Sequence, residues 1–166
     1  MEQGINAMRK RIITAAQPRQ TPADMDWLNL EELAEVEITS EDVNHPIESA
    51  LLLDRQGEWR AVTPGKQVIR LVFTSPQTLR HIRLKFVECS VERTQEFVLR
   101  WLPENGGAWR EILRQQWNFS PLGSTIEEED LQVELPSVKI LEVAITPDIS
   151  GGNAIASLAL LRLAGS

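Results

Sequence analysis

The chain has 166 residues, with 17 Lys and Arg against 24 Asp and Glu, so its formal net charge is -7. This length suits a single domain with one core, and the negative charge opposes unspecific binding to nucleic acid or to anionic membranes. The one cysteine, Cys89, permits no intrachain disulfide, so the fold does not depend on an oxidising compartment.

The first 32 residues are predicted to form an N-terminal arm. Apolar residues recur at helical spacing over Ile5–Ala16 and favour a short helix, which Pro18 and Pro22 stop. The run "IITAA" is too short for the apolar region of a secretory signal, and no stretch approaches the roughly 20 apolar residues that span a bilayer. We therefore expect a cytoplasmic protein that has no membrane partner.

From Glu35 onward, apolar and polar residues alternate in short runs, which is the pattern of half-buried strands. The runs, in chain order, are "EVEITS", "QVIRLVF", "LRHIRLKFVE", "QEFVLRW", "LQVELP" and "ILEVAIT". Turn-forming residues in "TPGK", "TSPQ", "PENGGAW" and "SGGN" predict chain reversals. Such strands bury their apolar faces against a second sheet, so residues 33–166 are predicted to form an all-β sandwich.

Five segments, taken in order, resemble the galactose-binding-like jelly roll of the discoidin and coagulation-factor C-type domains. They are "HPIESALLLDRQGEWRA", "GKQVIRLVF", "LRHIRLKF", "EFVLRWLPENGGAWREI" and "GGNAIASLALLRLAG". Asp54, Gly57 and Trp59 match the loop and Trp of that family, and Trp109 matches its hairpin turn. The resemblance implies a jelly-roll β-sandwich that recognises carbohydrate, without catalysis, through loops at one end of the sandwich.

Members of that family often bind a structural calcium ion through the Asp-containing loop and a Glu near the closing strand. Here Ser157 stands where that Glu is expected, and Asp54 has only Gln56 and Glu58 nearby. Calcium takes about six to eight oxygen ligands, which these side chains do not supply unless backbone carbonyls provide most of them. These departures argue against calcium, and we expect no other cofactor.

Catalytic residues are few. The chain has two histidines, His45 and His81, and no G-x-S-x-G elbow, and one Cys with two distant His cannot form a closed zinc site. We expect His81 to be an exposed strand histidine, whereas His45, before Pro46, could cap a turn or touch a ligand. No enzymatic activity is expected.

The acidic run "EEED", Glu127–Asp130, allows two interpretations. Paired carboxylates could serve acid-base chemistry or a metal ion. We favour a solvated loop whose charges repel one another and discourage strand pairing.

Two stretches hold the remaining candidate ligand-binding residues. Arg93 and Gln95 lie in "ERTQEF", and Arg114, Gln116 and Trp117 lie in "RQQWNF". Antiparallel pairing around the "PENGG" turn would bring the two stretches together. The Arg and Gln side chains suit vicinal hydroxyls or a carboxylate, and the Trp could stack on a sugar, with His45 at the rim.

The alternative for this cluster is structural. Trp117 and Phe119 would then close the end of the sandwich, while Arg93, Glu96 and Arg114 would form cross-strand ion pairs. Among the other tryptophans, we expect the one at position 101 to face the core and those at 59 and 109 to be packed, which leaves Trp117 as the aromatic residue most available to a ligand.

Two functions follow. The first is a non-catalytic binding module for carbohydrate, with Trp117, Arg114, Gln116, Arg93 and Gln95 as its site. The second is an intracellular module of the same fold that docks another protein, favoured by the arm and the "EEED" run. The sequence patterns leave the oligomeric state open.

Overall fold

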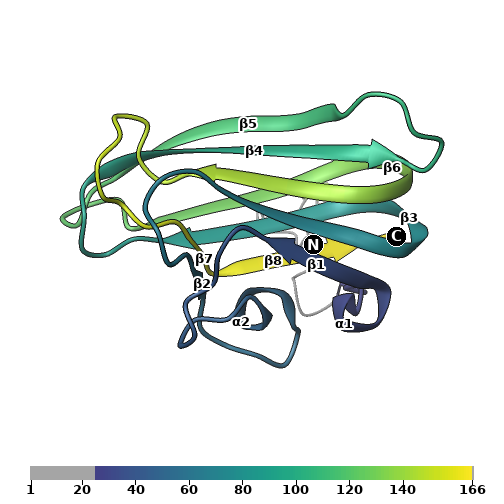
Figure 1. Ribbon diagram of the computed structural model, residues 1–166, viewed down its shortest axis with the longest axis horizontal. Coiled ribbons are helices and arrows are strands. Elements are labelled where there is room, and N and C mark those ends of the chain that lie inside the picture. Colours follow the sequence, from purple (N-terminus) through teal and green to yellow (C-terminus); the bar gives the residue numbers. More distant parts are fainter. Residues whose placement is uncertain (1–24, 166) are drawn as a thin grey trace, which may run out of the picture.

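The computed structural model describes residues 25–165, so the helix predicted over Ile5–Ala16 lies outside the described residues. The elements are α1 (Leu30–Leu33), β1 (Ala34–Ile38), α2 (Glu48–Leu51), β2 (Trp59–Arg60), β3 (Gln67–Val87), β4 (Arg93–Pro103), β5 (Arg110–Phe119), β6 (Ile126–Thr146), β7 (Ser157–Leu158) and β8 (Leu160–Ala164). Figure 1 shows the strands in two layers, with α2 beneath β7 and β8. The all-β prediction is confirmed. Within residues 25–165, no helix is long and apolar enough to cross a membrane.

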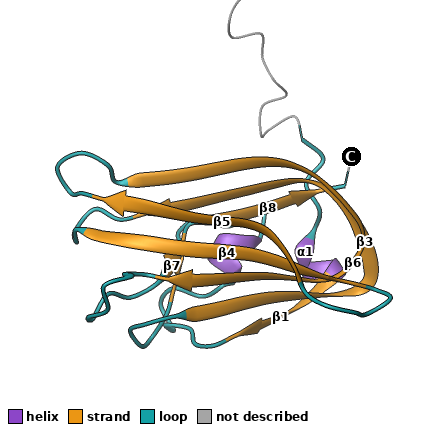
Figure 2. Cartoon of the chain, turned by 90° about the horizontal axis from the view of Figure 1, so that it is seen from above, coloured by secondary structure: helices purple, strands orange, loops and turns teal. Residues whose placement is uncertain are grey.

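The two longest strands, β3 and β6, belong to both layers. In the first layer the strand order is β1-β3-β6-β4-β5. The second half of β3 pairs on one side with β8, over His81–Lys85, and on the other with the first half of β6, which makes the second layer. Figure 2 shows both long strands curving from one layer into the other.

The prediction of a chain reversal at "TSPQ" is wrong. Residues 74–77 lie inside β3, where the register with β6 shifts, so the chain bends between the layers without reversing. The predicted strands "LQVELP" and "ILEVAIT" are likewise the two halves of β6, which bends near Ser137, a residue with φ of 52°. Bulges permit such bends because the extra residue locally interrupts the ladder of hydrogen bonds.

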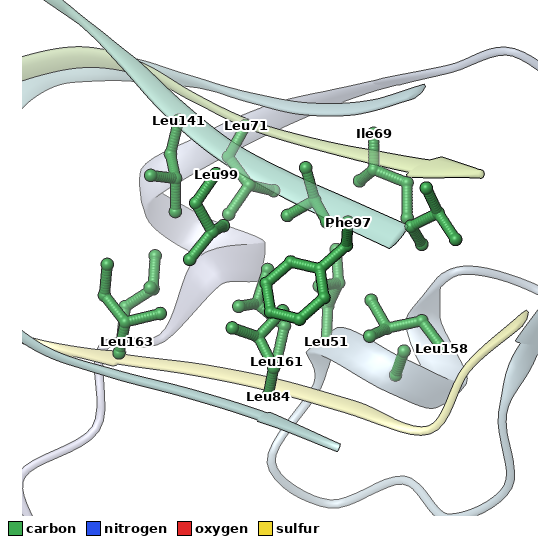
Figure 3. Close-up of a cluster of buried hydrophobic side chains, with 14 of the residues drawn as sticks. Leu51, Ile69, Leu71, Leu84, Phe97, Leu99, Leu141, Leu158, Leu161 and Leu163 are labelled. Atoms are coloured by element: carbon green, nitrogen blue, oxygen red, sulfur yellow. The ribbon is translucent and has the colours of Figure 1, made fainter. Parts of the chain in front are cut away.

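Side chains of alternate residues fill the space between the layers. The three inward sets predicted from the period-two pattern are all buried: Ile69, Leu71 and Phe73; Ile82, Leu84 and Phe86; Phe97, Leu99 and Trp101. Figure 3 shows Phe97 between two sets of leucines. Leu71, Leu99 and Leu141 belong to the first layer, and Leu84, Leu161 and Leu163 belong to the second. Each such side chain stabilises the fold by roughly 1.5–3 kcal/mol through removal of apolar surface from water.

The chain enters the sandwich alongside β8. The Leu28 N–H donates to the Leu163 carbonyl at 2.7 Å, and Trp27 pairs with Ala164. The Asn29 side chain then caps α1 by accepting a hydrogen bond from Glu31 N–H at 3.2 Å. This entry places Leu30 in the core.

Candidate functional site

The hairpin of β4 and β5 brings the two predicted stretches together but divides their side chains between two faces. Gln95 pairs directly with Trp117, as the sequence predicts. Since side chains alternate across a strand, Arg93, Gln95 and Trp117 point inward. Arg114 and Gln116 lie on the outer face with Glu96.

Arg93 and Gln95 are buried, with 4% and 0% of their surface exposed. The Arg93 guanidinium donates to Glu88 Oε1 at 2.8 Å, to the Pro147 carbonyl at 2.7 Å and to Gln95 Oε1 at 3.1 Å, and it lies 4.8 Å from the centre of the Phe119 ring. These contacts connect the start of β4 to the loop between β3 and β4 and to the loop that follows β6. Burial alone would raise the pKa of Glu88, but hydrogen bonds from Arg93 and from backbone N–H groups outweigh burial and lower the pKa.

Gln95 continues this network to Glu127 on β6. The Gln95 amide donates to Glu127 Oε1 at 3.2 Å, and Glu127 is fully buried. Burial, and then the neighbouring carboxyl of Glu129, raise the pKa of Glu127 to about 8. Glu127 is therefore largely protonated at neutral pH, and its carboxyl can donate as well as accept a hydrogen bond.

The favoured interpretation of the acidic run as a loop is wrong, because the run lies in strand β6. Glu127 and Glu129 face inward. On the outer face, Glu128 Oε2 pairs with Arg83 at 2.9 Å, and Asp130 pairs with His81. If the run is treated as a strand, in which successive side chains point to opposite faces, it predicts that Glu127 and Glu129 share one face and that Glu128 and Asp130 share the other.

The prediction that His81 is an exposed strand histidine is wrong. His81 is mostly buried, because it contacts Asp130 and its ring meets the Trp27 ring edge-on at 5.5 Å. Trp117 is half-buried and packs against the hydrophobic core, as the structural alternative expects. Its availability to a ligand stays a prediction.

The outer face of the hairpin also follows the structural alternative. Arg114 forms ion pairs with Glu96 at 3.2 Å and with Glu111 at 2.9 Å, and the Gln116 amide donates to Glu96 at 3.3 Å. His45 lies apart, in the loop before α2, with Nδ1 3.5 Å from the Asp42 carboxylate. The ligand-binding role of these residues stays a prediction, and they do not form one cluster.

A charged cluster on the outer face of the first layer surrounds Glu142, which is 1% exposed. Arg70 donates to it at 2.7 Å and Arg100 at 2.6 Å, and both guanidinium groups lie within 6 Å of the Trp109 ring, at 5.7 and 4.8 Å. Burial alone would raise the pKa of Glu142, but the two arginines outweigh burial and lower it. The prediction that Trp59 is packed is confirmed, since it is fully buried. Trp109 is half-buried against the two arginines.

A groove with a volume of about 450 Å³ lies over the outer face of β3 and β8. We call it the β3–β8 groove. Its walls come from α2, the loop before β2, β3 and β8, and its polar lining residues are Ser49, Arg55, Gln56, Glu58, Lys85 and Arg162. Ligand pockets commonly fall between about 300 and 1,000 Å³. The sequence reasoning missed this groove because its residues come from four separate segments.

Arg162 holds the segment around α2 onto β8. Its Nη1 donates to the carbonyl oxygens of Ala50 at 2.9 Å and Leu161 at 3.0 Å, and its Nη2 donates to Leu52 at 3.2 Å. Burial lowers the pKa of Arg162, yet an arginine in a protein keeps its charge. The guanidinium thus fixes one positive charge in the groove wall.

The residues around Asp54 do not fit the calcium ion that the family resemblance implies. The carbonyls of Ala50 and Leu52, just before this loop, already accept hydrogen bonds from the Arg162 guanidinium. A second cation beside that charge would be repelled, and Ser157 brings no carboxylate. In residues 25–165, no three His, Cys, Asp or Glu side chains are placed to hold a metal ion.

The chain matches no model of a known protein family and no curated protein sequence. Several solved structures share its fold. The family 32 carbohydrate-binding module of C. perfringens NanJ, in complex with galactose, has a TM-score of 0.56 and 14% identity, and the match covers 82% of this chain and 96% of that one. The fold is a galactose-binding-like jelly roll.

Two further structures support the same conclusion about the fold. The CBM32 of AlyQ, in complex with 4,5-unsaturated mannuronic acid, has a TM-score of 0.55 and 14% identity over 81% of this chain and 97% of that one. A chitosan-binding module of a chitosanase/glucanase from Paenibacillus sp. IK-5 has a TM-score of 0.57 and 15% identity over 83% and 99%. The jelly-roll prediction is confirmed.

Proposed function

We propose that this jelly roll is a non-catalytic carbohydrate-binding module, as the resemblance to discoidin-type domains implies. The similar structures named above, from carbohydrate-binding modules, match this chain over almost their whole length. At identities of 14–15% this likeness concerns the fold, so the proposal needs a site in this chain. The observation that carries it is the β3–β8 groove.

The β3–β8 groove combines the two kinds of surface that a sugar requires. Arg55 and Lys85 supply N–H donors, and Gln56 supplies both a donor and an acceptor for hydroxyl groups. Val87 and Leu160 add apolar surface for the C–H groups of a sugar ring. Ser49 is the only hydroxyl among the described lining residues, and no histidine lines the groove with it, so the proposed role is binding without turnover.

A glycan array tests the proposal. The native protein should bind at least one glycan saturably, and Lys85→Ala should weaken that binding. Arg114→Ala is the matched comparison, because it removes a cation from the hairpin surface predicted as the site from sequence. Loss of binding in Arg114→Ala alone would move the site to the hairpin, and absence of binding in the folded native protein would refute the proposed function.

A second candidate function, docking of another protein, is favoured by one surface. An apolar groove of about 370 Å³ lies between β1 and α2, and its apolar lining includes Val36 and Ile38. Three glutamates, at positions 31, 41 and 48, also line it. Such a surface suits a basic amphipathic segment of a partner. A labelled peptide of that kind should bind the native protein and lose affinity for Ile38→Glu.

The cytoplasmic location remains a prediction from the sequence. Cell fractionation with detection of the native protein tests it, and recovery outside the cytoplasm would direct the search for the ligand to extracellular glycans.

A further inference from the structure

Resting on the proposed carbohydrate binding, we infer that the β3–β8 groove selects acidic saccharides, which carry a carboxylate on the sugar ring. Arg55, Lys85 and Arg162 would bind that carboxylate. The ring hydroxyls would contact Gln56 and Glu58 at the same groove.

The first support is a local excess of unpaired positive charge. Several arginines elsewhere on the surface lie beside acids, such as Arg83 beside Glu128 at 2.9 Å and Arg114 beside Glu111 at 2.9 Å. Within residues 25–165, neither Arg55 nor Lys85 forms an ion pair, although the chain carries more acids than bases. A negatively charged protein thus concentrates three cations around one groove.

Arg162 strengthens this argument because it is already held in place. Three of its N–H groups donate to backbone carbonyls, and no carboxylate among the described residues pairs with it. A guanidinium has five N–H donors, so two remain for a ligand. Since the carbonyls fix its orientation, little side-chain entropy is lost when a carboxylate binds.

The acid that lines the groove does not cancel this charge. Glu58 Oε2 is engaged by Arg60 at 3.0 Å. The other oxygen of Glu58 can accept a hydrogen bond from a sugar hydroxyl. An acceptor beside three cations suits a ligand that has both a carboxylate and hydroxyl groups better than it suits sulfate, which has no hydroxyl group to donate to Glu58.

The groove also lacks the feature that would favour neutral sugars. An aromatic ring would offer a neutral sugar a large apolar contact surface, and no aromatic side chain is among the groove's described lining residues. With the stacking contribution absent, charge-assisted hydrogen bonds are the strongest interactions the groove can make. Charge on the ligand is therefore the expected basis of selectivity.

Titration calorimetry with two matched ligands tests the inference. An oligosaccharide of galacturonic acid and one of galactose, of equal length and linkage, differ in the carboxylate. The full native chain should bind the acidic one at least about tenfold more tightly, the effect of one good charge-assisted hydrogen bond. Raising the NaCl concentration from about 0.05 to 0.5 M should weaken this binding, because salt screens exposed charges.

Variants locate the effect in the groove. Lys85→Glu and Arg55→Glu should each abolish the preference for the acidic ligand, whereas Lys66→Glu, which reverses an exposed cation in the loop before β3, should preserve it. Lys85→Arg keeps the charge and should retain most of the affinity. Arg162→Ala also removes contacts that hold the segment around α2, so the inference does not depend on its outcome.

Each result has a distinct meaning. Equal affinity for both oligosaccharides would refute acidic selectivity and leave carbohydrate binding in place. Binding of inorganic phosphate or sulfate without either oligosaccharide would refute an acidic saccharide as the ligand. A folded native protein that binds none of these, nor any glycan on an array, would overturn the proposed function as well.

Discussion

Replacing Glu127 with Gln should make the stability of this protein less dependent on pH. The fold raises the pKa of Glu127 from 4.5 to about 8, chiefly by burial and then by the carboxyl of Glu129. Between these two values the folded state binds this proton more tightly than the unfolded chain does. The free energy of unfolding of the native protein therefore falls as the pH rises through this window.

The magnitude follows from the shift. Each pH unit within the window changes the free energy of unfolding by about 1.4 kcal/mol. From about pH 5.5 to pH 8.5 the contribution of Glu127 to stability falls by up to about 3 kcal/mol, and by less where Glu129 shares the proton. The variant Glu127→Gln keeps an acceptor for Gln95, so it should be close to the native protein at the lower pH and clearly more stable at the higher one.

Urea unfolding, followed by tryptophan fluorescence at both pH values, measures this difference. Glu134→Gln, an exposed position on the same strand, is the matched control and should leave the pH dependence unchanged. Equal stability changes in Glu127→Gln at the two pH values would mean that Glu127 is ionised in the folded protein, and would refute the reasoning.

Four other changes follow from the contacts described. Arg93→Met should lower the free energy of unfolding by about 1–3 kcal/mol in urea, because the Pro147 carbonyl and Gln95 Oε1 lose their buried donor and Glu88 loses its charge partner. Glycan affinity should stay unchanged; a loss of affinity without a loss of stability would support a binding role for Arg93. Glu142→Gln should cost about 1–3 kcal/mol at neutral pH. Since the native pKa of Glu142 is lowered, this difference should shrink as the pH falls through that pKa, which acid titration of stability would show. Ser137→Gly should raise the free energy of unfolding by up to about 1 kcal/mol, because glycine adopts a positive φ without steric cost. The urea midpoint should rise accordingly, and a lower midpoint would contradict this. Adding calcium or EDTA should leave the melting temperature unchanged, because Ser157 brings no carboxylate and the Arg162 guanidinium repels a cation next to the Asp54 loop.

The strands and their buried faces could be predicted from the sequence because the pattern is local. The alternation in "QVIRLVF" identifies Ile69, Leu71 and Phe73 as an inward set whatever the strand pairs with. The continuity of β3 through Pro76 could not be predicted in this way. Pro beside Ser and Thr is typical of turns, and only pairing with the distant strand β6 keeps this segment extended.

The candidate site also has one part that local patterns predict and one part that they do not. The pairing of Gln95 with Trp117 follows from counting residues back from the turn, and it is confirmed. Strand alternation also contained the signal that Trp117 and Arg114 do not share a face. The β3–β8 groove had no such local signal, because Arg55, Lys85 and Arg162 become neighbours only when the loop and two strands fold together.

The sharing of β3 and β6 between the two layers has a consequence for folding kinetics. Gln67 pairs with Ile145, and Val87 pairs with Ile126, so neither layer can form before the chain has been made through β6. Such long-range pairing gives a high contact order, for which folding in roughly milliseconds to seconds is typical. During synthesis, the apolar faces of β3 and β4 therefore stay uncovered until β6 has been made and has paired with them. The chain is most prone to aggregation in this interval.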